Sequence, residues 1–72
     1  PRQVTITLEK AGDDLIPPLS HVVSPAEPTL VDVFLPMGCG LMAGDRVTWV
    51  LRDAHTEEVL AEQTAISRVE IW

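Results

Sequence analysis

The chain has 72 residues, a net charge of −6 and a single cysteine, Cys39. A chain this short forms one domain, residues 1–72, and buries only about 60% of the surface that its unfolded form exposes. One cysteine excludes an intramolecular disulfide, and the acidic excess repels a phosphate backbone, so nucleic acid is an unfavourable partner. No run of about 18 apolar residues is present, so we expect no membrane span. A lone free thiol slightly favours a reducing, cytoplasmic location.

Aromatic residues make up only 4% of the chain, so its core must be built from Val, Leu and Ile, which favour strands when they alternate with polar residues. The first such alternation places Val4, Ile6 and Leu8 on one face of a strand. Residues 10–14 then end it. The sequence therefore opens with a strand that has one buried face.

Residues 15–28 contain four of the six prolines and cannot form a helix or a central strand. We expect an extended segment that crosses the fold here, in which residues 20–23 form a short strand pairing at a sheet edge. Residues 29–35 regain strand character. Because apolar side chains occupy both parities of this run, we predict a central strand that is buried on both faces.

The clearest strand is predicted for residues 46–53, with Val47, Trp49 and Leu51 on one face. A short polar loop follows, and residues 58–64 have strand composition, so the two runs predict a β-hairpin. The competing interpretation is a short helix over residues 56–66, which contain several good helix formers. Residues 68–72 alternate again and predict a last strand.

These elements predict an all-β fold: a small antiparallel β-sandwich or barrel of five to six short strands. The pattern does not decide between the two architectures.

Residues 36–42 form a loop that is unusually apolar and carries no charge before Asp45. Contiguous exposed apolar surface marks interaction sites. We therefore predict that this loop contacts a protein partner, which we expect to be another copy of the chain. The predicted interaction residues are Pro36, Met37, Cys39, Leu41 and Met42.

The same loop has alternative interpretations. Met37, Cys39 and Met42, with His21 nearby, are the soft ligands that Cu(I) prefers, but methionine and cysteine also fill gaps in cores. Cys39 with a histidine and Asp45 supplies the residue types of a nucleophilic site, although the spacing fixes no geometry. We expect no catalytic residue, no bound metal and no cofactor.

The leading hypothesis is a non-catalytic protein–protein interaction or assembly module that self-associates. The alternative is an acidic inhibitor or nucleic-acid mimic that binds a basic protein surface. It requires the carboxylates at the hairpin end and those of Asp13 and Asp14 to share one face with Glu62 and Glu70.

Overall fold

The computed structural model describes residues 1–28 and 30–71. Five strands form one antiparallel sheet that does not close into a barrel. The strands are β1 (Arg2–Lys10), β2 (Asp13–Asp14), β3 (Leu19–Val23), β4 (Arg46–Asp53) and β5 (Val59–Ile66). The predicted all-β class is confirmed.

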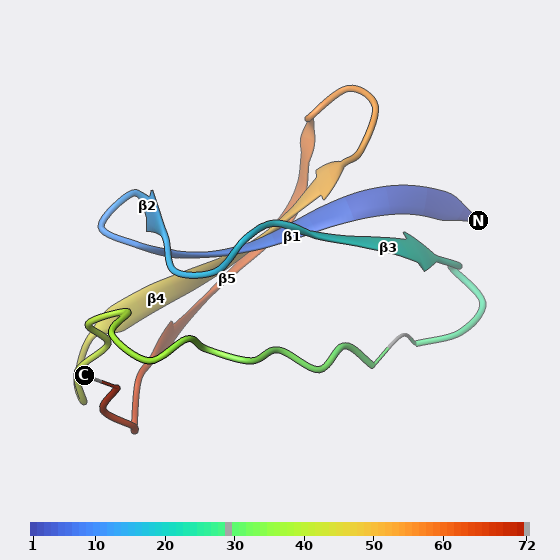
Figure 1. Cartoon of the computed structure of the whole chain (residues 1–72). Coiled ribbons are helices and arrows are strands. Elements are labelled where there is room, and N and C mark those ends of the chain that lie inside the picture. The colour runs from blue at the N-terminus through green and yellow to red at the C-terminus, as the bar shows by residue number, and fades with distance from the viewer. Residues whose placement is uncertain (29, 72) are drawn as a thin grey trace.

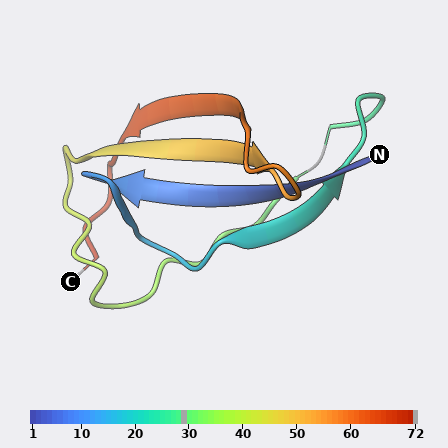
Figure 2. The ribbon, with the colours of Figure 1, turned by 90° about the horizontal axis from the view of Figure 1, so that it is seen from above.

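Strand β1 is the centre of the sheet (Figures 1 and 2). One side of β1 pairs with β4, and the other side pairs first with β3 and then with β2. The turn into β2 has only two residues, Ala11 and Gly12, with φ of 52° and 86°. Both central residues of a type I′ turn need positive φ, which Gly12 adopts without strain.

The predicted pairing at residues 20–23 is confirmed, because β3 lies antiparallel to β1 with His21 opposite Val4. The hairpin is also confirmed. Asp53 holds its loop by accepting hydrogen bonds from the N–H groups of His55, at 2.8 Å, and Thr56, at 3.0 Å. The alternative helix over residues 56–66 is wrong, since cross-strand pairing with β4 overrides the weak helix propensity of this run.

Two predicted strands are absent from the described chain. Residues 30–35 are extended but lie in no sheet, and their side chains alternate between exposed and half-buried instead of being buried on both faces. Residues 68–71 form no strand and contribute only an isolated bridge between Ile71 and Leu41. The remainder of these two predictions, Thr29 and Trp72, lies outside the described residues.

The core lies between one face of the sheet and the segment that crosses it after β3. Leu8, Ile16, Leu41 and Val47 form its buried cluster. Figure 1 shows the crossing segment in green running along the sheet from the end of β3 to the start of β4. The opposite face is polar: Arg52 donates to the hydroxyl of Thr7 at 3.0 Å and pairs with Glu9 at 3.5 Å.

Candidate interaction surface

The extended segment after β3 carries a row of exposed apolar side chains. Leu30, Phe34 and Met37 are 92%, 89% and 93% exposed. We call these three residues the apolar row. A folded chain normally buries such large side chains, and three of them exposed on one short segment indicate a candidate interaction surface. Sequence analysis missed Leu30 and Phe34, because it assigned them to a strand buried on both faces.

The other side of this segment anchors it to the core. Val33 and Leu35 are half-buried and pack against the buried cluster. Alternation along an extended backbone points neighbouring side chains in opposite directions. Anchoring of Val33 and Leu35 therefore turns Phe34 outward. The run L-V-D-V-F-L contains this period-two signal, and Asp32, at the parity of Leu30 and Phe34, indicates which side faces water.

The five predicted interaction residues do not share one environment. Pro36 and Met37 are exposed, Cys39 and Met42 are half-buried, and Leu41 is only 3% exposed. The expectation that the whole loop presents apolar surface is corrected accordingly, since Leu41 belongs to the chain's own core. Of the five, Met37 belongs to the apolar row, and Pro36 is the exposed residue beside it.

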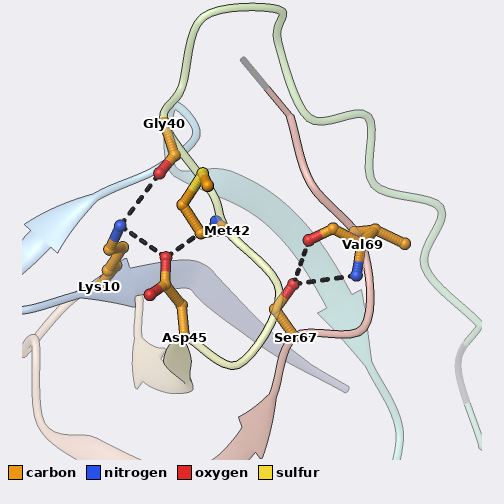
Figure 3. A network of polar contacts seen from close by, with 6 residues as sticks. All are labelled: Lys10, Gly40, Met42, Asp45, Ser67 and Val69. Carbon is orange, nitrogen blue, oxygen red and sulfur yellow. Dashed lines mark hydrogen bonds and ion pairs between the residues drawn. The ribbon is translucent and has the colours of Figure 1, made fainter.

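A charged contact fixes the loop that follows the apolar row (Figure 3). Lys10 Nζ lies 2.6 Å from Asp45 Oδ2 and donates to the carbonyl oxygen of Gly40 at 3.0 Å. The same carboxylate oxygen accepts the Met42 N–H at 2.8 Å. The charge of Lys10 on β1 thus ties both ends of this loop to the sheet. The end of the apolar row is therefore held in place.

The C-terminal segment adds a second tie to the same loop. The Ile71 N–H donates to the Leu41 carbonyl oxygen at 2.7 Å, and the Ser67 N–H donates to that of Asp45 at 2.8 Å. The Ser67 hydroxyl also donates to the carbonyl oxygen of Val69 at 2.8 Å, which shapes the turn after β5 (Figure 3).

Two carboxylates make the fold sensitive to acid. Hydrogen bonds from Lys10 and from the Met42 N–H hold the pKa of Asp45 below its ordinary value of 3.8. Those from Thr56 and His55 lower the pKa of Asp53 in the same way. A carboxyl group whose pKa is lower in the folded state stabilises the fold at any pH above its pKa in the unfolded state. That contribution is lost as the pH falls through its pKa in the folded state.

We therefore expect the melting temperature to fall as the pH drops below 3.8. The Asp45→Asn variant should show a weaker dependence in this window, because its amide does not titrate. Thermal melts monitored by circular dichroism from about pH 6 to about pH 2 check this. An Asp14→Asn control at an exposed position should keep the wild-type profile, and identical profiles for Asp45→Asn and wild type would contradict the role of Asp45.

The ligands of the alternative copper and nucleophilic sites are spread over the sheet. Cys39 lines a shallow cavity of about 470 Å³ with Lys10, at one end of β1. His21 lies opposite Val4, six residues back along β1, which corresponds to about 20 Å. His55 lies beyond the far end of β4. The structure does not bring either histidine to Cys39.

Within residues 1–28 and 30–71, no group of three or more His, Cys, Asp and Glu side chains could hold a metal ion. The same ranges contain no helix that is long and apolar enough to cross a membrane.

Carboxylates gather on the polar face of the sheet. A cavity of about 450 Å³ is lined by Glu9, Asp14, Asp53 and Glu57, together with Arg52. Asp14 thus shares one cavity with two residues of the hairpin end, Asp53 and Glu57, whereas Asp13 lines a different cavity with Cys39, so the structure brings together only part of the set that the acidic alternative requires. Two of these groups already have partners, because Glu9 pairs with Arg52 and Asp53 caps the hairpin loop.

No known protein family, curated protein or solved structure matches the chain.

Proposed function

We propose that this chain is a non-catalytic protein–protein interaction module that self-associates. The observation that carries the proposal is the apolar row, Leu30, Phe34 and Met37, each about nine-tenths exposed on an anchored segment. A net charge of −6 disfavours nucleic acid as the partner. A fixed backbone lowers the entropic cost of binding, because the segment need not be ordered when a partner arrives.

The surface area of the chain supports a partner of substantial size. The chain exposes 5325 Å², whereas a compact monomer of its 7.9 kDa is expected to expose about 4,400 Å². The excess of about 900 Å² is close to the roughly 800 Å² that each partner buries in a standard interface. The radius of gyration, 12.9 Å against about 11 Å for a compact chain of this length, points the same way.

We infer that the chain is an open sandwich and not a barrel, with the sheet as one layer and the crossing segment as the other. The apolar face of the sheet is covered by this segment, whose Val33 and Leu35 pack on the buried cluster, instead of by curling of the sheet. Strand β5 also remains far from β2 in the strand order.

Replacing the apolar row tests the proposal. We expect Phe34→Ser and Leu30→Ser to weaken self-association at least tenfold, because each removes an apolar side chain that is exposed only in the isolated chain. Their melting temperatures, extrapolated to low protein concentration, should stay near that of wild type, since neither side chain supports the core. Sedimentation velocity over a micromolar concentration series gives the dissociation constants.

Thr56→Ser, on the exposed hairpin loop, is the matched control and should change neither quantity. A wild-type chain that remains monomeric at high micromolar concentration would overturn self-association. Unchanged association of both Ser variants would remove the apolar row from the interface.

A second candidate function is capture of a basic protein surface by the acidic cavity on the polar face. The observation that favours it is that Asp14 and Glu57 line the same cavity. The two functions differ in their response to salt. Contacts between charges weaken steeply as salt rises, whereas apolar self-association persists. A salt series on the complexes that form separates them.

A further inference from the structure

Strand β5 is the outermost strand of the sheet, and almost all of its residues are exposed to solvent. It follows β4 in the order β2-β1-β4-β5, so its other edge has no strand partner among the described residues (Figure 2). Seven of its eight residues are exposed, and only Leu60 is half-buried. Both faces and one edge of the strand are therefore accessible.

This edge lacks the features that usually prevent strand pairing between molecules. Natural edge strands are protected by lysines, prolines, bulges or short length. Strand β5 contains neither lysine nor proline, and Glu62 is its one charged residue. The register shift in its pairing with β4 lies near its start, beside Leu51 and Arg52, so residues 61–66 are regular.

We propose that two copies of the chain join through the edges of β5, antiparallel, about a two-fold axis at Gln63. The inference rests on the proposed self-association and adds a strand-edge contact to the one that the apolar row makes. The sheets of the two copies then form one continuous sheet. A second copy is the occupant because the β5 sequence is compatible with itself in one register, and because the same exposed edge on another copy offers the unpaired N–H and C=O groups that this edge leaves free within the described chain.

Side-chain direction and charge select that register. An antiparallel two-fold pairing puts residues of the same parity opposite each other, because both must point to the same face. With the axis at Gln63, Glu62 lies opposite Thr64 of the other copy, and Ala61 lies opposite Ala65. Moving the axis to Glu62 would bring two carboxylates together, and moving it to Thr64 would place Glu62 against Ile66. Like charges directly opposite are destabilising.

Apolar side chains at the two ends of the strand support the same contact. Leu60 is half-buried and Ile66 is 55% exposed. In the proposed register Ile66 lies opposite Leu60 of the other copy, so the seam gains an apolar pair at each end. The polar centre of Gln63, Glu62 and Thr64 can form hydrogen bonds across it.

Disulfide trapping tests the register. The background is Cys39→Ala, which removes the native thiol. We expect Gln63→Cys to form a disulfide-linked dimer under mild oxidation, because directly opposed residues have the Cα separation that a disulfide needs. Ala61→Cys and Ala65→Cys should each cross-link poorly alone and efficiently when mixed. Mass spectrometry identifies the linked species, and Thr56→Cys is the exposed control that should remain monomeric.

The outcomes separate this inference from the proposed function. A wild-type oligomer in which neither Gln63→Cys nor the mixed pair cross-links faster than Thr56→Cys would overturn the β5 contact and leave self-association standing. A monomeric wild type with no cross-linking would overturn both. Cross-linking of Glu62→Cys instead of Gln63→Cys would overturn the register. Circular dichroism melts verify that each variant is folded, and the mixed pair keeps the test valid if Gln63→Cys is unstable.

Discussion

Replacing Leu41 with aspartate is expected to unfold the protein. Leu41 is 3% exposed and packs with Leu8, Ile16 and Val47 in the buried cluster. Shortening a buried leucine to alanine costs about 2 to 5 kcal/mol. An aspartate would place a carboxylate inside this apolar cluster, and burying a charge among apolar side chains is still more costly. A chain of this length has a total stability of about 4 to 11 kcal/mol, so little of the folded state should remain.

The matched control is Met37→Asp, four residues away in the same loop. Met37 is 93% exposed, so the same new charge should change the free energy of unfolding by less than about 0.5 kcal/mol. Urea unfolding monitored by tryptophan fluorescence measures both variants. A Leu41→Asp protein with the same unfolding midpoint as Met37→Asp would show that Leu41 is not part of the core. Met37→Asp should also weaken self-association, because it places a charge at the end of the apolar row.

The local features of the fold were predictable because they depend on neighbouring residues. The limits of β4 agree with the predicted strand, and the predicted hairpin is present. Strand alternation in residues 46–53 and the capping chemistry of Asp53 lie within about ten residues of each other. Residues 58–64 were harder to assign, since their helix formers conflict with their strand neighbours. Pairing with β4 decides the conflict.

The segment after β3 shows where sequence reasoning failed. Its apolar residues at both parities imply burial on two faces, but two-sided burial needs a second layer of structure. A 72-residue chain with one sheet supplies only one layer, so Val33 and Leu35 are covered and Leu30 and Phe34 remain exposed. Composition could not indicate which of the two alternating sets of side chains in this segment would face water. Asp32 was the one residue that marked the exposed parity.

The candidate surface was predictable only in part for a related reason. Glycines and methionines mark residues 36–42 as an apolar loop, but they do not indicate which of its side chains the core accepts. The choice depends on long-range contacts: the Lys10–Asp45 ion pair and the bridge from Ile71 to Leu41. Lys10 lies 35 residues before Asp45, and no local pattern signals that pairing.

Truncating Trp49 to alanine is expected to cause a large loss of stability. Trp49 lies on the core face of β4, opposite Leu8 of β1 and Gln63 of β5, and packs against the buried cluster. The sequence placed it on the correct face but predicted full burial, whereas the side chain is half-buried. The full cost of removing a buried tryptophan, about 3 to 5 kcal/mol, should therefore fall to about 2 to 3 kcal/mol.

For a domain of this size, a loss of 1 kcal/mol lowers the melting temperature by about 4 to 8 °C, so we expect Trp49→Ala to melt about 8 to 24 °C below wild type. Thr48→Ala is the matched control on the opposite face, where the Thr48 hydroxyl meets that of Thr64 at 3.3 Å in an exposed contact. It should lower the melting temperature by no more than a few degrees. Equal melting temperatures for the two variants would show that the core lies on the other face of β4, and the packing of the crossing segment onto Trp49 would then be incorrect.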